Sequence, residues 1–176
     1  MSNIQIVDAE DSLLKTVNRD EIDFANDIYR ITVLWVVDDD KRPLITKRDV
    51  SMLGEADVWA PSVVGTVVDI ETYRTNPLNE VANQLGLDDV ALRAGPKQLF
   101  EGERNYFCRW YLAEISSEPD PETGEDAPVP TPNDDIISEM KWTSVEELKQ
   151  DVVDNPDNYV STMTESIAAL EEMIAP

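Results

Sequence analysis

The sequence contains no histidine among its 176 residues and only one cysteine, Cys108. The missing imidazole excludes a histidine-ligated zinc site, a histidine base and the Ser–His or Cys–His nucleophile pairs. A single thiol excludes an internal disulfide, and its place in the alternating segment NYFCRWYL predicts a small buried side chain instead of a reactive one. Any catalysis by this chain therefore depends on carboxylates and a metal ion.

Basic residues are also scarce, because 14 Lys and Arg stand against 37 Asp and Glu and give a net charge of -23. This charge repels duplex DNA and anionic membranes, so we expect no nucleic-acid polymer and no membrane as a partner. No apolar run approaches a membrane span, and the first residues lack a basic region followed by an apolar one. A cytoplasmic protein is therefore expected, with residues 1–176 forming one domain.

The stretch over residues 57–87, DVWAPSVVGTVVDIETYRTNPLNEVANQLGL, predicts a strand, a loop and a helix. The helix is expected to begin at about Asn76 or Pro77 and to end at Gly86, since proline favours the first turn and glycine follows the last. Apolar and polar residues alternate with a helical period and so define two faces. The apolar face carries Leu78, Val81, Ala82 and Leu85, and the polar face carries Glu80, Asn83 and Gln84.

This stretch resembles the signature of the Nudix superfamily, whose members hydrolyse a diphosphate linked to another moiety. The family box reads G-x5-E-x7-R-E-U-x-E-E-x-G-U, where U is apolar, and the glycine and apolar positions are kept here. Glu71 matches the first glutamate and Glu80 the second. Three positions differ, because Asn79 stands for the arginine and Asn83 and Gln84 stand for the last two glutamates.

The resemblance implies a Mg²⁺ site on one helical face, with Glu80 and Glu71 as the remaining metal and catalytic carboxylates. Each Glu replaced by an amide removes a full charge, worth on the order of 4 kcal/mol at about 4 Å and an effective dielectric near 20. Weak Mg²⁺ binding is therefore expected, with Asn83 and Gln84 in place of the usual Glu. Because the family arginine orients the loop glutamate, Asn79 is expected to hold Glu71 less well.

The segments before the box extend the resemblance. Residues 3–20 predict an N-terminal hairpin similar to that of the Nudix branch that includes isopentenyl-diphosphate isomerase. The isomerase itself is excluded, because its metal site needs histidines. Residues 29–37 and 44–48 look like the two central strands of the Nudix sheet. By resemblance three basic residues on these strands contact phosphate or lie at the substrate mouth, and solvated strand ends are the alternative. They are Arg30, Lys47 and Arg48.

The segments after the box also fit the family. Residues 98–115 predict two strands, of which the second is apolar on both faces and therefore central. Residues 116–135 form an acidic, proline-rich surface loop, either a plain insertion or a lid. A strand over residues 136–142 carries Glu139, which resembles the late family glutamate that serves the metal or activates water. A helix capped at Thr143 or Ser144 and a final helix over residues 160–174 complete the chain.

We therefore predict a Nudix-type α/β/α sandwich with a mixed β-sheet between helices, and the resemblance also allows a homodimer. Three functions remain open. The first is binding of a nucleoside or other organic diphosphate, with hydrolysis lost or strongly reduced. The second is a divergent Mg²⁺-dependent diphosphatase that uses carboxylates from outside the box helix. The third is a regulatory protein that uses the acidic loop. The outside carboxylates are Asp69, Glu71, Glu139, Glu101 and Glu103.

Overall fold

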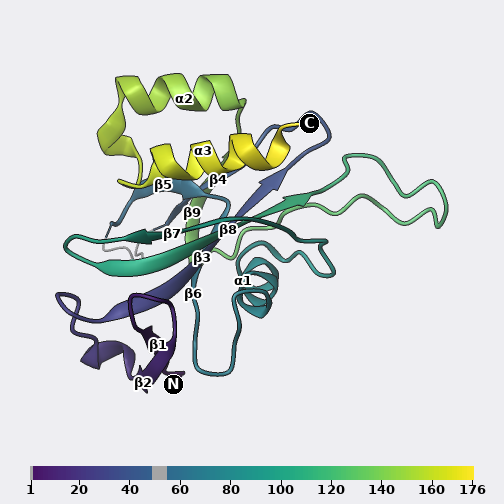
Figure 1. Cartoon of the computed structure of the whole chain (residues 1–176). Coiled ribbons are helices and arrows are strands. Elements are labelled where there is room, and N and C mark those ends of the chain that lie inside the picture. The colour runs from purple at the N-terminus through teal and green to yellow at the C-terminus, as the bar shows by residue number, and fades with distance from the viewer. Residues whose placement is uncertain (1, 49–54) are drawn as a thin grey trace.

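The computed structural model describes residues 2–48 and 55–176 (Figure 1). The strands in these ranges are β1 (Ile4–Val7), β2 (Leu13–Val17), β3 (Ile28–Val37), β4 (Leu44–Arg48), β5 (Val58–Pro61), β6 (Val63–Thr66), β7 (Arg93–Phe100), β8 (Asn105–Glu114) and β9 (Ile137–Trp142). The helices are α1 (Thr75–Leu85), α2 (Val145–Asp154) and α3 (Met163–Ile174), with 3₁₀ turns at Arg19–Glu21 and Pro156–Asn158.

The larger sheet has the order β2-β1-β3-β8-β7, and β6 also pairs with β3. The pairing of β3 with β8 is parallel and the other pairings are antiparallel, so the sheet is mixed. β8 lies between β3 and β7 and is covered on both faces, as its apolar sequence predicts. Charged side chains within β8 therefore need a specific explanation.

Helices cover both faces of this sheet (Figure 1). On one face α3 packs Met163, Ile167 and Leu170 into the larger apolar core. Within that core the two indole N–H groups of Trp35 and Trp110 both bind buried Ser166, at its carbonyl (2.8 Å) and its hydroxyl (3.0 Å). On the other face α1 packs against a second core, which contains Val81, Leu85, Leu34, Val36 and Tyr111. The predicted α/β/α sandwich is confirmed.

A smaller sheet, in the order β5-β4-β9, adjoins the larger one. Two predictions need correction here. β3 and β4 are both strands, but they lie in different sheets. The single strand expected before the box helix is divided into β5 and β6 at Ser62, one in each sheet. The buried Ser62 hydroxyl donates to the Leu44 carbonyl (2.6 Å) and accepts from the Val36 amide (2.8 Å), which links the two sheets at the break.

The box helix α1 begins at Thr75, one residue before the predicted start, and ends before Gly86. Gly86 has φ +64°, and its N–H donates to the Ala82 carbonyl, so glycine satisfies a left-handed cap. The loop over residues 116–135 is largely exposed. Its end packs, however, because the N–H of Thr131 donates to Leu85 O (2.8 Å) and that of Asn133 to Gln84 O (2.9 Å). The predicted surface loop is therefore exposed over most of its length, but its last residues pack against the end of α1.

The C-terminal helices follow their sequence signals. Ser144 caps α2, since its hydroxyl accepts from the Glu147 amide at 3.1 Å. α3 begins at Met163, three residues later than predicted. None of the helices in the described part of the chain has the length and apolar character needed to cross a bilayer.

Candidate functional site

The box helix rests directly on β6 at Gly65. A Cβ atom built at Gly65 would lie 2.5 Å from Cγ of Glu80 and 2.7 Å from Oδ1 of Asn76. Ordinary carbon contacts are about 3.5–4.0 Å, so a larger residue at this position would displace the helix. The box glycine therefore allows Glu80 to lie half-buried against the strand.

Glu71 is held firmly in the loop before α1. Its Oε2 accepts from Nδ2 of Asn76 (2.7 Å) and from the Val68 amide (3.1 Å), and its Oε1 accepts from Nδ2 of Asn79 (3.1 Å). Asn79 thus still binds Glu71 in place of the family arginine. Three N–H groups donate to this carboxylate, so its oxygen atoms are engaged in holding the loop before α1.

Asn76 is the residue that the sequence reasoning missed in this network. It is fully buried, and besides Glu71 its Nδ2 donates to the Thr66 carbonyl at 3.0 Å. Its Oδ1 accepts a hydrogen bond from the Thr32 hydroxyl on β3. A buried amide with all its groups bonded fixes the start of α1 against the sheet and orients Glu71.

Gln84 lies on the sheet side of α1, which corrects its predicted place on the polar face. Only 3% of its surface is exposed, whereas Asn83 is exposed. Its Nε2 donates to the Val64 carbonyl (3.0 Å) and to Oε2 of Glu80 (2.6 Å), and its Oε1 is buried without a partner. The spacing could have shown this, because Val81, Gln84 and Leu85 stand at i, i+3 and i+4.

A buried cation lies beside this pair. Arg48 is 6% exposed, and its Nη1 donates to the same Val64 carbonyl at 3.3 Å, while its Nε has no partner. Burial lowers the pKa of Arg48 to about 10, against the opposing charge of Glu80. Burial likewise raises the pKa of Glu80, although the hydrogen bond from Gln84 and the charge of Arg48 act the other way. Arg48 was expected at a ligand-facing surface and instead lies beneath it.

Three basic residues form a row across the α1 face of the larger sheet: Arg30 on β3, Arg109 on β8 and Lys97 on β7. Arg30 is paired in register with Phe107, and Arg109 is the next residue of β8 on that face. Lys97 is directly opposite Arg109 in the antiparallel pair. Like charges in that position repel one another, and Nε of Arg109 is buried without a partner. The Asp11 carboxylate already binds Nε of Arg30 and Nζ of Lys97, each at 2.7 Å, and it leaves Nε of Arg109 without a partner.

Gln5 joins the cation row to the box loop. Its Oε1 accepts from Nη1 of Arg30 at 2.7 Å. Its Nε2 donates to the carbonyls of Val68 and Glu71, each at 2.8 Å. The row therefore borders the loop that holds Glu71. Lys97 and Arg109 were not predicted, although a charged residue within the apolar strand NYFCRWYL was a readable signal for Arg109.

Comparison with known proteins places this geometry in context. No model of a protein family matches the chain. The chain is 25% identical over 164 residues to a prenyl-diphosphate phosphatase from Methanosarcina mazei. The aligned region covers 93% of this chain and 92% of that protein.

Solved structures decide the fold. The crystal structure of a protein from Deinococcus radiodurans matches 94% of this chain and 97% of its own, with a TM-score of 0.75 and 17% identity. The NUDIX domain of NrtR from Shewanella oneidensis, solved with ADP ribose, matches 83% of this chain and 88% of its own, with a TM-score of 0.53 and 11% identity. The chain has the Nudix fold. The resemblance seen in the box is thus confirmed at the level of the fold.

The side chains of this Nudix fold do not fit the metal site that the family box implies. Among the described residues, no group of three or more His, Cys, Asp or Glu side chains could hold a metal ion. Gln84 also turns an amide N–H donor, not an oxygen, toward the Glu80 carboxylate. A divalent cation needs oxygen ligands on that face, and Glu80 is the single box-helix carboxylate that remains there.

Glu139 is placed away from a shared site with Glu80 and Glu71. It lies on β9 in the smaller sheet, paired in register with Lys47 on β4. The Lys47 Nζ is 3.2 Å from Oε2 of Glu139 and 3.8 Å from Oδ1 of Asp57. Lys47 and Glu139 therefore form a partly exposed ion pair, and for Lys47 this matches the alternative of a solvated strand end.

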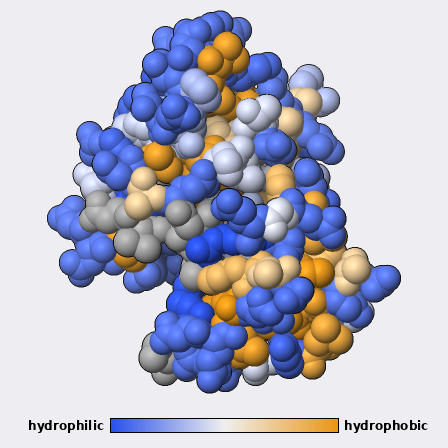
Figure 2. Space-filling view, turned by 90° about the vertical axis from the view of Figure 1, so that its left-hand side faces the viewer, coloured by the Kyte–Doolittle hydropathy of each residue, from blue (hydrophilic) through white to orange (hydrophobic). Residues whose placement is uncertain are grey.

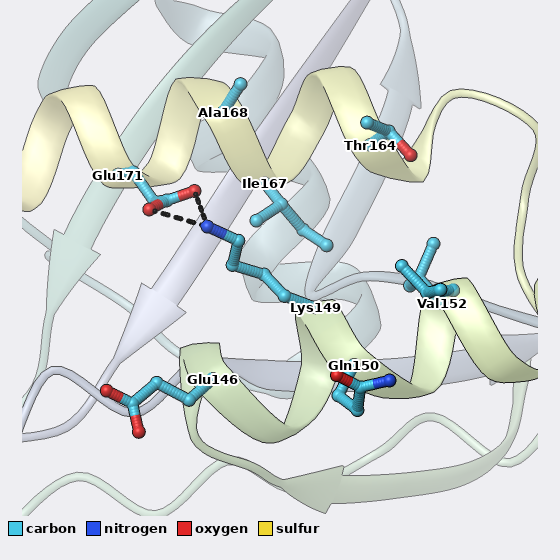
Figure 3. A pocket seen from close by; sticks show the side chains of 9 residues that line it. Glu146, Lys149, Gln150, Val152, Thr164, Ile167, Ala168 and Glu171 are labelled. Atoms are coloured by element: carbon cyan, nitrogen blue, oxygen red, sulfur yellow. Dashed lines mark hydrogen bonds and ion pairs between the residues drawn. The ribbon is translucent and has the colours of Figure 1, made fainter.

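A cavity of about 600 Å³ lies between α2 and α3, on the face of the sheet opposite α1. Figure 3 shows Lys149 reaching from α2 to Glu171 on α3, at 3.1 and 3.2 Å from its two carboxylate oxygens, beside Ile167 and Val152. The ion pair spans a groove lined with apolar stems. None of the residues predicted for the site lines this groove, so it is separate from the Nudix site.

Proposed function

We propose that this Nudix-fold protein binds a small organic diphosphate and that its metal-dependent hydrolysis is lost or strongly reduced. The observation that carries the proposal is the row of Arg30, Arg109 and Lys97 beside the box loop. In a chain with a net charge of -23, three cations gathered on one sheet face mark a site for an anion. Arginine and lysine side chains supply the charge-assisted hydrogen bonds that phosphate oxygens accept.

The box-helix face supports the loss of hydrolysis. The side-chain amide of Gln84 donates hydrogen bonds to the Val64 carbonyl and to Glu80, and Arg48 brings a buried positive charge near Glu80. A fixed cation at this place disfavours a second cation by Coulomb repulsion. Mg²⁺ binding is therefore expected to be weak, and the diphosphate is held by side chains of the protein itself.

Calorimetric titration with ADP ribose and with a ten-carbon prenyl diphosphate, in the presence of EDTA, tests the binding. We expect binding of at least one of them, lost in Arg109→Met. Lys149→Met is the matched control. Lys149 lies on α2, away from the cation row, so its replacement should leave the affinity unchanged. Equal affinity of wild type and Arg109→Met, or no binding of either compound, would contradict the proposal.

The metal is tested by rebuilding the box. Asn83→Glu and Gln84→Glu, with Asn79→Arg to pair with Glu71, add two carboxylates to α1 near Glu80, an exposed one at residue 83 and a buried one at residue 84. Calorimetry should show tighter Mg²⁺ binding than in wild type, because each added carboxylate contributes an oxygen ligand and a charge. If the wild type already binds Mg²⁺ as tightly as the rebuilt variant, the metal site is intact and this part of the proposal fails.

The second candidate function is hydrolysis of a prenyl diphosphate. It is favoured by the 25% identical relative of that name, and by exposed apolar side chains on β2, where Leu13 and Leu14 are 57% and 63% exposed. Figure 2 shows apolar side chains gathered at the lower end of the molecule, the height at which Figure 1 places this hairpin. The apolar tail of a prenyl diphosphate would contact these side chains and be partly removed from water.

The two candidates separate in a phosphate-release assay with a prenyl diphosphate and Mg²⁺. The binding proposal expects release far below about 1 per second, an ordinary enzyme rate. Turnover at that rate, lost on Glu80→Gln, would establish the diphosphatase with carboxylates from outside the helix. Unchanged turnover in Glu80→Gln would point to a contaminating phosphatase, since Glu80 is the carboxylate that the box helix retains.

A further inference from the structure

Asp11 lies in the turn between β1 and β2, and its carboxylate takes the contacts that a bound anion would take. Its Oδ1 accepts from Nε of Arg30 at 2.7 Å. Its Oδ2 accepts from Nζ of Lys97 and from the hydroxyl of Tyr73, each at 2.7 Å. The Asp11 side chain is only 6% exposed. One carboxylate thus fills a pocket built from two cations and a phenol.

The groups around Asp11 belong to parts of the fold that do not depend on the turn. Arg30 is on β3 and Lys97 is on β7, the two strands that flank β8, and Tyr73 precedes α1. The Tyr73 ring centroid lies 5.0 Å from Cζ of Arg30 and 5.6 Å from Nζ of Lys97, so the ring supports both cations. If the turn moved away, Arg30 would lose its bonds to the Asp11 carboxylate and to the Asp11 carbonyl, the latter 2.6 Å from its Nη2. It would still be held by Gln5 and the Tyr73 ring.

The turn, in contrast, lies at the edge of the fold. β2 is the last strand of the larger sheet, and four of its five residues are exposed. Asp11 itself has φ +65°, in the left-handed region that residues other than glycine rarely adopt. The pairing of β1 with β2 also shifts register beside the turn, between Ile6 and Val7. A turn residue on an edge hairpin can leave its place with little disturbance of the core.

We propose that Arg30, Lys97 and Tyr73 form a binding site for a phosphoryl group, and that the Asp11 carboxylate occupies this site in the free protein as a tethered competitor. The inference deepens the proposed function, because it names which part of the diphosphate binds here and what must move first. A phosphoryl group carries more charge than a carboxylate and offers three acceptor oxygens, so it can displace Asp11. Singly charged carboxylate ligands cannot, and the turn thereby selects polyanions.

The test compares inorganic pyrophosphate binding to wild type, Asp11→Asn and Asp8→Asn by calorimetry at fixed ionic strength with EDTA. Asp11→Asn should bind at least about tenfold tighter, the gain expected if the open turn is about a tenth of the wild-type population. Asp8→Asn makes the same charge change in the same turn, but the Asp8 carboxylate accepts from the amides of Glu10 and Ser12 and not from the pocket cations, so this variant should match wild type. Adding Lys97→Met to Asp11→Asn should remove the gain.

A second measurement follows the turn directly. In wild type, pyrophosphate should speed hydrogen exchange of the Asp11 amide, which is bonded to the Asp8 carbonyl at 3.0 Å. If Asp11→Asn binds pyrophosphate no tighter than wild type, Asp11 is a structural ion-pair partner and the inference is overturned. If Asp11→Asn shows no gain for pyrophosphate but the protein still binds an organic diphosphate, the proposed function stands. A gain for pyrophosphate without binding of any organic diphosphate leaves the anion site standing and overturns the proposed function.

Discussion

Replacing Gly65 by alanine tests the contact on which the box geometry depends. The added methyl carbon would lie 2.5 Å from Cγ of Glu80, 3.2 Å from its Cδ and 2.7 Å from Oδ1 of Asn76. Since carbon atoms prefer separations of about 3.5–4.0 Å, Glu80 and the first turns of α1 must shift by roughly 1 Å. Asn76 cannot yield freely, because it is fully buried and bonded to Thr32, Thr66 and Glu71.

The cost has two parts. Overpacking a close contact costs about 1–3 kcal/mol, and weakening the bond from Asn76 to the Glu71 carboxylate costs a further 1.5–3 kcal/mol or so. Together these lower the melting temperature by roughly 5–24 °C, at about 2–4 °C per kcal/mol for a domain of this size. Thermal and urea unfolding measure the change. Gly102→Ala is the control, because a Cβ at Gly102 would meet no atom within 4 Å. Equal melting temperatures for the two variants would refute the reasoning.

Four further predictions concern stability and the burial of particular side chains. Gln84→Glu should cost about 2–4 kcal/mol without metal, since it buries a second carboxylate beside Glu80, whereas Asn83→Glu on the exposed side should change stability by less than about 0.5 kcal/mol. Cys108 is buried with a raised pKa, so a thiol reagent should label it only on unfolding; labelling of native protein would contradict its placement. Burial raises the pKa of Asp11, but hydrogen bonds from its basic neighbours outweigh burial and leave that pKa lowered. Its stabilising contribution is therefore complete above about pH 4 and lost as the pH falls through the lowered pKa, so the stability advantage over Asp11→Asn should shrink below about pH 4. Deleting residues 118–126 should leave the melting temperature unchanged, and extending the deletion through residue 132 should lower it, because the later residues cap α1.

The hydrophobic periodicity and the residues that start and end helices predicted most of the elements. The alternating segment around Cys108 became the central strand β8, and Pro77 and Gly86 bounded α1 to within one or two residues. These signals are local, since each residue's preference for a helix, strand or cap depends on its neighbours in sequence. The division of strands between two sheets was not predicted. It depends on Ser62 bonding to Leu44 and Val36, and these are contacts between segments distant in sequence.

The candidate site shows the same limit. The box pattern located Glu71 and Glu80. The helical period, however, assigned Gln84 to the polar face with Glu80 and Asn83, because its side chain is polar, although it stands three residues after Val81 and packs on the sheet side. Arg30 was identified by resemblance, but its partner Asp11 could not be, since a turn residue and a strand residue meet only through the sheet order. The sequence pattern thus supplied the scaffold, and the pairing of charges required the three-dimensional fold.

The parallel pairing of β3 with β8 sets the order in which the chain can fold. Its register pairs Ile28 with Asn105, and in the sequence the whole box stretch, residues 57–87, lies between these two strands. Closing so long a loop is entropically costly and slows folding relative to hairpins made of neighbouring strands. During synthesis β8 leaves the ribosome after α1, so the cation row on β3, β8 and β7 is assembled only once most of the chain has emerged. The helix and loop of the box are complete in sequence well before the surface that they border exists.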